Sequence, residues 1–69
     1  MNEIWTDAAM RGVAQGVFES SFDGTGESVW GAVELARCAL TERFEGVESS
    51  RRERVMWQVV GAFEEMVVE

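Results

Sequence analysis

The thiol of Cys38, the single cysteine of this 69-residue sequence, is the side chain best suited to covalent chemistry. A reactive cysteine needs its thiolate form, which neighbouring carboxylates disfavour. Glu34 and Glu42 lie four residues before and after Cys38, so a helix would place all three on one side. The sequence also contains no histidine to act as a base. We therefore expect no catalytic role for Cys38, and a lone cysteine cannot form an internal disulfide.

Metal binding would have to come from carboxylates, and the segment DGTGESVWGAVE, which starts at Asp23, invites comparison with an EF-hand calcium loop. Asp23, Thr25, Glu27 and Glu34 occupy the first, third, fifth and twelfth positions of that pattern. The sixth position is Ser28, where the sharp turn of a calcium loop requires glycine, and the third is neither Asp nor Asn. The sequence therefore predicts no metal site and no cofactor.

Three arginines, Arg51, Arg52 and Arg54, precede Trp57, a combination that could contact phosphates and stack on a base. Glu53 interrupts this run, and the whole chain carries 13 acids against 6 basic residues, a formal net charge of -7. Binding to nucleic acid relies on basic side chains that neutralise phosphates, so this composition argues against direct binding and against anionic membranes. A protein partner with a basic surface fits the charge better.

Motifs of known enzymes are missing from the sequence. Neither the phosphate-binding pattern GxxxxGK[ST] nor the hydrolase pattern GxSxG occurs. Glu64 and Glu65 are adjacent, so on a helix their carboxylates would not face each other. We therefore expect no enzymatic activity.

Two loop signals divide the chain into three segments whose apolar residues have helical spacing. The loops are DGTGE, from Asp23, and EGVESS, from Glu45. Helices are expected at about residues 6–22, 27–45 and 51–68, within a single domain of residues 1–69. Amphipathic helices joined by short loops most simply form a small all-α, antiparallel three-helix bundle.

The first segment has Thr6 as its expected N-cap, with Trp5 and Met10 placed for a hydrophobic staple. Its expected apolar face consists of Ala9, Met10, Val13 and Val17. Beside that face, Gly12, Gly16 and Ser20 form a ridge without bulky side chains, which we call the glycine ridge. A glycine inside a helix costs about 1 kcal/mol relative to alanine, so we expect another helix to approach this ridge closely.

The second segment is expected to be the central helix and to end at Glu45, with Gly46 as a left-handed stop. Its expected buried residues are Val29, Val33, Leu35, Ala36, Ala39, Leu40 and Phe44. The third segment has Ser50 as its expected N-cap and Glu53 three residues later, the spacing of a capping box. Its expected buried residues are Val55, Met56, Val59, Val60, Phe63, Met66 and Val67. Trp57 and Val68 fall on its flank, where a tryptophan either anchors an interface or covers the edge of the core.

Charge is expected to divide unequally between the two ends of such a bundle. At one end, the glutamates that close the second helix meet the arginines that open the third, and the two groups partly compensate each other. The opposite end would gather Glu19, Asp23, Glu27, Glu64, Glu65 and Glu69 with no arginine nearby. Like charges gathered in this way repel. One explanation is an acidic patch, extended along Glu27, Glu34 and Glu45, that docks on a basic protein; the other is that acids simply collect on exposed helix ends.

A small acidic helical bundle of this kind, with no histidine and one cysteine, resembles the phage-encoded inhibitors of bacterial defence, the anti-CRISPR proteins among them. The resemblance is one of size and charge asymmetry, and the carboxylates of Glu27, Glu34, Glu64 and Glu65 carry it. Families of this kind often bind basic nucleic-acid grooves on effector complexes, and some imitate nucleic acid. The resemblance therefore implies a stoichiometric inhibitor that acts in the cytoplasm of a host cell.

We accordingly expect a protein-binding inhibitor whose acidic surface occupies a nucleic-acid site on its target. The expected contact residues are Glu27, Glu34, Glu64 and Glu65, with Trp57 as an apolar anchor. The alternative is a structural homo-oligomeric helical module, in which the glycine ridge or the flank of Trp57 and Val68 buries surface against a second copy. The N-terminal residues do not have the pattern of a signal peptide, and the longest apolar stretch, VMWQVVGAF, is too short for a membrane span, so a cytoplasmic location is expected.

Overall fold

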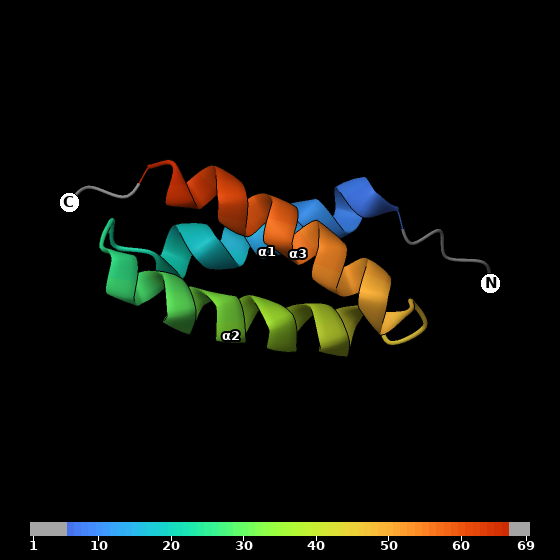
Figure 1. Ribbon diagram of the computed structural model, residues 1–69. Helices are drawn as coiled ribbons and strands as arrows, with labels where there is room; N and C mark the ends of the chain where they lie inside the picture. The colour runs from blue at the N-terminus through green and yellow to red at the C-terminus, as the bar shows by residue number, and fades with distance from the viewer. Residues whose placement is uncertain (1–5, 67–69) are drawn as a thin grey trace.

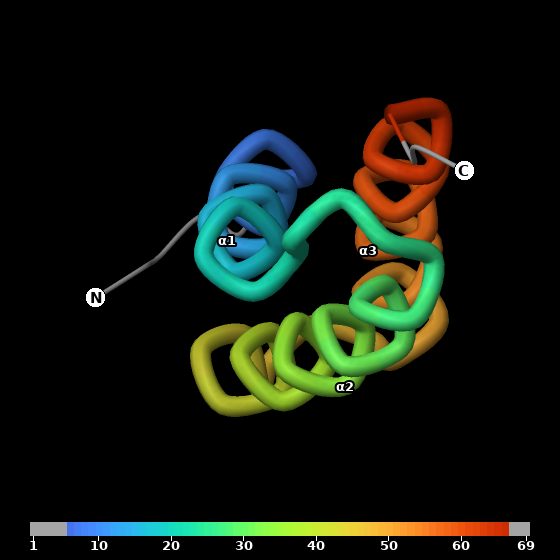
Figure 2. The backbone as a smooth tube through the Cα atoms, turned by 90° about the vertical axis from the view of Figure 1, so that its left-hand side faces the viewer, coloured from blue at the N-terminus to red at the C-terminus, as the bar shows by residue number. Residues whose placement is uncertain are grey.

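Three α-helices form between residues 6 and 66, the part of the chain that this computed structural model describes. They are α1 (Asp7–Ser21), α2 (Gly26–Arg43) and α3 (Ser49–Glu64). Successive helices run in opposite directions, so the end of α1, the start of α2 and the end of α3 share one end of the molecule (Figure 1). A view along the bundle places α1 and α3 side by side above α2 (Figure 2), and all three pairs are in contact. The predicted all-α, antiparallel three-helix bundle is confirmed.

Threonine side chains cap the N-termini of α1 and α2. The backbone N–H of Ala9 donates to Thr6 Oγ1 at 3.1 Å, which confirms the predicted cap of α1. An equivalent hydrogen bond caps α2, where the N–H of Ser28 donates to Thr25 Oγ1 at 3.3 Å. Each bond satisfies a donor that the first turn of a helix would otherwise leave without a partner. Trp5, the other half of the predicted staple, lies outside the described residues.

The start of α3 differs from the prediction of a capping box. The helix begins at Ser49, with Glu48 as its N-cap, and the Glu48 side chain makes no capping hydrogen bond. Ser50 therefore lies within the first turn, and Glu53 uses its carboxylate for Arg37 on α2 instead. The ion pair between helices has replaced the local bond that the sequence spacing indicates. At the other end, α3 stops at Glu64 with Glu65 as its C-cap, earlier than expected, and the expected residues 67 and 68 lie beyond the described part of the chain.

The end of α2 also differs, because the helix stops at Arg43 with Phe44 as its C-cap. Gly46 is not the left-handed stop we expected; among the described glycines, the one with a positive φ is Gly24, at 95°. Phe44 and Val47 are both buried, and the guanidinium of Arg52 donates from Nη1 to the carbonyl oxygens of both residues. The turn after α2 is therefore held by the buried side chains of Phe44 and Val47 and by the hydrogen bonds from Arg52. A left-handed glycine is not required there.

The core consists of one apolar stripe from each helix and two residues of the second loop. Its buried members are Met10, Ala14 and Phe18 of α1, Val29, Ala32, Val33, Ala36 and Leu40 of α2, Phe44 and Val47, and Val55, Met56, Val59, Val60 and Phe63 of α3. The rings of Phe18 and Phe63 lie 5.1 Å apart between their centroids, which joins α1 to α3 near the end of the bundle. Within residues 6–66, no polar or charged side chain is buried.

Several expected core positions proved to lie elsewhere. Val13 and Val17 only border the core, and Ala9 is exposed, because the buried stripe of α1 runs through Ala14 and Phe18. Leu35 is 54% exposed and Met66 is 55% exposed, although both were expected to be buried. Each helix has two neighbours that together cover only part of its circumference, so apolar residues at the margin of the stripe remain in contact with water.

The glycine ridge is open, contrary to the expected close approach of another helix. A Cβ atom added to Gly12 or Gly16 would meet nothing within 4 Å. Both glycines instead line a shallow hollow of about 470 Å³ between α1 and α2.

None of the helices described between residues 6 and 66 combines the length and the apolar character needed to cross a membrane.

Candidate protein-binding surface

Five exposed carboxylates gather at the end of the bundle where α1 ends, α2 begins and α3 ends (Figure 1). We call this group the acidic pole; its members are Glu19, Asp23, Glu27, Glu64 and Glu65. Among the ion pairs of residues 6–66, none includes a member of the acidic pole. The sixth acid predicted there, Glu69, lies outside the described residues. The structure thus brings together the described acids that the sequence places at this end.

The other charges of the described chain balance one another. They are the acids Asp7, Glu34, Glu42, Glu45, Glu48 and Glu53 and the arginines Arg11, Arg37, Arg43, Arg51, Arg52 and Arg54. The net negative charge of residues 6–66 therefore equals the charge of the acidic pole.

The arginines at the start of α3 have partners at the end of the bundle opposite the acidic pole. Arg51 Nε lies 2.8 Å from Asp7 Oδ1, and Arg54 Nη2 lies 3.5 Å from Asp7 Oδ2. The hydrogen bond from Arg51 is the main reason that the pKa of Asp7 lies below its usual value. Arg52 donates to the carbonyl oxygens of Phe44, the C-cap of α2, and of Val47 in the loop. These contacts differ from the expected compensation, because they use Asp7 and backbone carbonyls in place of the glutamates at the end of α2.

Asp23 holds the loop between α1 and α2. Its Oδ1 accepts hydrogen bonds from the backbone N–H of Thr25 at 3.0 Å and from Thr25 Oγ1 at 2.7 Å. The bond from the Thr25 hydroxyl contributes most to a pKa of Asp23 below its usual value. Glu34, at the last position of the calcium-loop comparison, pairs with Arg37 at 3.3 Å. In the described chain no group of three or more potential ligands is arranged to hold a metal ion.

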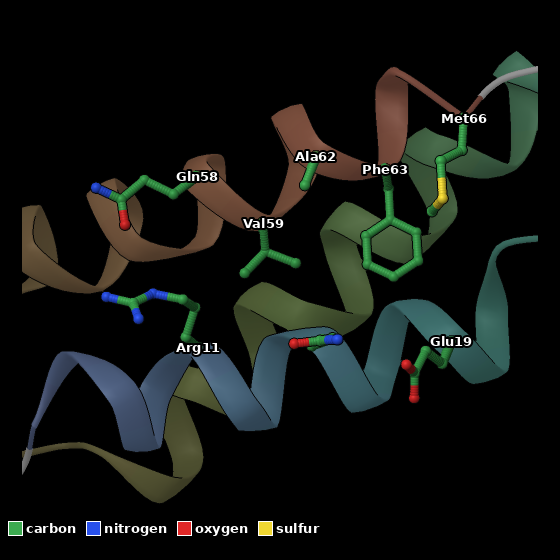
Figure 3. A pocket seen from close by; sticks show the side chains of 8 residues that line it. Arg11, Glu19, Gln58, Val59, Ala62, Phe63 and Met66 are labelled. Atoms are coloured by element: carbon green, nitrogen blue, oxygen red, sulfur yellow. The ribbon is translucent and has the colours of Figure 1, made fainter.

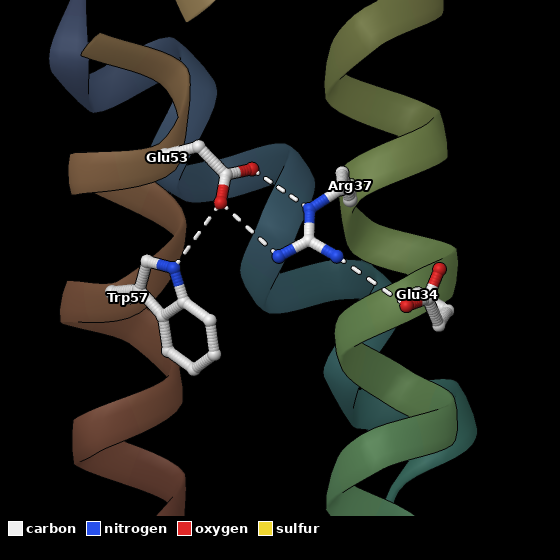
Figure 4. A network of polar contacts seen from close by, with 4 residues as sticks. All are labelled: Glu34, Arg37, Glu53 and Trp57. Atoms are coloured by element: carbon white, nitrogen blue, oxygen red, sulfur yellow. Dashed lines mark hydrogen bonds and ion pairs between the residues drawn. The ribbon is translucent and has the colours of Figure 1, made fainter. Parts of the chain in front are cut away.

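A second feature is a polar network across the outer side of α2 and α3 (Figure 4). Arg37 donates from Nε to Glu53 Oε2 at 2.8 Å and from Nη2 to Glu53 Oε1 at 3.1 Å. Trp57 Nε1 donates to the same Glu53 Oε1 at 3.2 Å. The bond from Arg37 is the main cause of a pKa of Glu53 below its usual value, and the same bond raises the pKa of Arg37. This hydrogen bond restrains the orientation of the Trp57 indole.

Two of the five predicted contact residues, Glu34 and Trp57, belong to this network, and Glu27 and Glu64 lie on the same sides of the two helices. Glu27 and Glu34 are seven residues apart on α2, and Trp57 and Glu64 are seven residues apart on α3, so each pair shares one side of its helix. We call the surface formed by these four residues together with Arg37 and Glu53 the α2/α3 face. Glu65 follows Glu64 directly and points about 100° away around the helix. Glu65, the fifth predicted contact residue, thus belongs to the acidic pole and not to the α2/α3 face.

Sequence reasoning did not select Trp30, the most exposed of the large apolar side chains in the described chain, at 68%. It lies three residues after Glu27 and four residues before Glu34, on the same side of α2. The signal was present, because the helical projection that buries Val29 and Val33 turns Trp30 outward. Trp57 itself is 42% exposed.

A groove of about 570 Å³ runs between α1 and α3 (Figure 3). Its apolar lining consists of Val59, Ala62, Phe63 and Met66, and its polar lining of Arg11, Gln15, Glu19 and Gln58. The apolar side chains come from α3 and from Met66, just beyond its end, and the rim carries charges of both signs. Cys38 is exposed on α2 and does not line it.

No protein-family model matches the chain, and neither a curated protein nor a solved structure matches it.

Proposed function

We propose that this chain is a protein-binding inhibitor whose acidic pole docks on a basic, nucleic-acid-binding surface of its target. The observation that carries the proposal is the separation of charge. Five exposed carboxylates without an ion pair occupy one end of the described chain, while the arginines lie in the middle and at the other end.

The cost of this arrangement to the free protein supports the proposal. Neither α1 nor α3 has a basic residue in its last turn, so the partial negative charges of two helix ends add to the acidic pole. Repulsion among these charges opposes folding, and a positively charged partner would relieve it. A basic groove built to hold phosphates has the required charge, and blocking it would inhibit the target stoichiometrically.

Phage-encoded inhibitors of bacterial defence, such as anti-CRISPR proteins, are the class that this proposal favours. The small size, the acidic composition and the separated charge of the chain are the features in common. In this proposal the chain acts inside a bacterial host cell and imitates the negative charge of a nucleic acid.

The test is capture from a bacterial lysate with the immobilised chain, followed by identification of the bound protein. We expect a nucleic-acid-binding protein that leaves the chain at high salt, because salt screens exposed charges. Addition of duplex DNA or RNA should displace it, since the two would compete for one surface. A bound protein that stays in the presence of excess nucleic acid and at high salt would contradict the proposal.

The second candidate is a structural homo-oligomeric module, and the open glycine ridge favours it. Gly12 and Gly16 face an empty hollow, where a second copy could approach closely. Light scattering over a wide concentration range separates the two functions. A dimer or larger assembly that persists on dilution supports the module, and a monomer at all concentrations contradicts it.

A further inference from the structure

The two tryptophans of the α2/α3 face lie on the same side of the Arg37–Glu53 ion pair. Trp30 lies seven residues before Arg37 on α2, and Trp57 lies four residues after Glu53 on α3. Because α2 and α3 are antiparallel, both displacements lead toward the acidic pole (Figure 1). At about 1.5 Å per residue, the two tryptophans are offset along the bundle by only about 5 Å. Both indoles are thus available to one bound segment.

Carboxylates surround these indoles. Glu27 and Glu34 flank Trp30 on α2, and Glu53 and Glu64 lie on either side of Trp57 along α3. Arg37 is the cation of this face, and it is already bound by Glu53 and Glu34. The face is therefore negative, so that a second copy of the same face or a nucleic acid would meet repulsion. A cationic partner that can also cover aromatic rings fits it.

Arginine meets both requirements better than lysine. Its planar guanidinium stacks on aromatic rings and can pair with a carboxylate through two parallel bonds, whereas the lysine ammonium is compact and strongly hydrated. Tryptophan is the aromatic residue that attracts a cation most strongly.

The orientation of Trp57 is restrained before any partner binds. Its Nε1 donates to Glu53 Oε1 at 3.2 Å, and Arg37 holds that carboxylate by two further hydrogen bonds (Figure 4). A ring that is already held loses less conformational freedom on binding.

We propose that Trp30 and Trp57 are stacking platforms for arginine side chains of the target, whose binding segment is rich in arginine and lies along the α2/α3 face. This inference rests on the proposed function and names the chemistry of the partner. It also adds Trp30 to the predicted contact residues.

The experiment compares two probes of equal length and charge, nona-arginine and nona-lysine, by calorimetric titration at one ionic strength. Wild-type protein should bind nona-arginine about fivefold more tightly or better, in keeping with the usual strength of cation–π contacts. The double variant W30A/W57A should bind both peptides equally, through its carboxylates alone. Leu35→Ala, which removes another exposed apolar side chain from a different side of α2, should keep the preference.

Equal binding of the two peptides to wild-type protein would overturn the inference, as would an arginine preference that survives in W30A/W57A. A shift from dimer to monomer in W30A/W57A would show that a second copy covers the face, and would also overturn it. None of these results decides the proposed function, because the acidic pole is unchanged in every variant. That function is tested separately by the capture and competition experiment.

Discussion

Arg37 Nε lies 2.8 Å from Glu53 Oε2, and Arg37 Nη2 lies 3.1 Å from Glu53 Oε1, so two parallel bonds join the middle of α2 to the beginning of α3. This ion pair has three consequences. Glu53 is not part of the cap of α3, its carboxylate is held where it accepts a hydrogen bond from Trp57, and the charge of Arg37 on the α2/α3 face is neutralised. One side-chain contact therefore shapes both the helix start and the proposed docking surface.

Replacing Glu53 by glutamine should make the free energy of unfolding less dependent on pH. The pKa of Glu53 is lowered in the folded chain, so its contribution is present above the ordinary pKa of a glutamate and is lost as the pH falls through the lowered value. Urea unfolding should show wild-type protein more stable than E53Q at pH 7, and a smaller difference at pH 2. R37Q/E53Q should resemble E53Q at both pH values. A difference between wild type and E53Q that is the same at pH 7 and pH 2 would contradict this assignment.

Alanine at Gly12 or Gly16 should stabilise the chain by about 0.5 to 1 kcal/mol each, because alanine favours the helix and the added Cβ has open space. Gly31→Ala, also inside a helix with nothing within 4 Å of the added atom, is the matched control and should behave alike. Thermal unfolding and sedimentation should be measured together. If G12A and G16A lower stability or break an assembly while G31A does not, the ridge is a contact with a second copy.

Alanine at Gly24 should have the opposite effect and destabilise the chain by about 1 to 2 kcal/mol. Gly24 has a φ of 95°, a conformation in which a Cβ is strained whatever space surrounds it. The turn that it allows also lets Asp23 receive its two bonds from Thr25. Urea titration of G24A is the measurement, and unchanged stability would show that the loop adopts another conformation in solution.

Truncation of Phe18 to alanine should cost about 3 to 5 kcal/mol, as expected for a large aromatic residue in a core. Phe18 is fully buried, and its ring packs on that of Phe63. Because so small a domain has little stability in reserve, circular dichroism should show F18A largely unfolded at room temperature. Leu35→Ala is the comparison, and it should change stability by less than about 0.5 kcal/mol because Leu35 is 54% exposed. Similar losses in the two variants would mean that the helices pack differently.

The helices and their antiparallel order could be predicted from the sequence because they depend on local spacing. Thr6 and the glycine-rich loop at Asp23 mark the boundaries, and apolar periodicity identified most of the buried residues of α2 and α3. The prediction was weaker for α1, where alanine and glycine are common and small side chains define an apolar side poorly. Ala14 and Phe18 were missed for this reason.

The contacts between helices could not be predicted in the same way. Glu53 has the spacing of a capping box, but its partner Arg37 is distant in the sequence and becomes available only once the bundle has formed. Gly46 was predicted to stop the second helix, but α2 ends at Arg43, where the chain turns to bury Phe44 and Val47. For the candidate surface, the grouping of acids followed from chain direction alone. Trp30 required a view of which sides of α2 remain uncovered.

The central claim is that the acidic pole contacts the target, and two charge-matched variants test it most directly. E64R/E65R reverses two carboxylates at the end of α3, and E42R/E45R reverses two at and just beyond the end of α2, at the other end of the bundle. Both variants place cations close to a helix end that favours them, so folding should be preserved in each. The measurement is the affinity of each variant for the protein captured from lysate. We predict that E64R/E65R weakens binding by about tenfold or more while E42R/E45R changes it by less than about threefold. Equal affinities, or a larger loss in E42R/E45R, would contradict the claim.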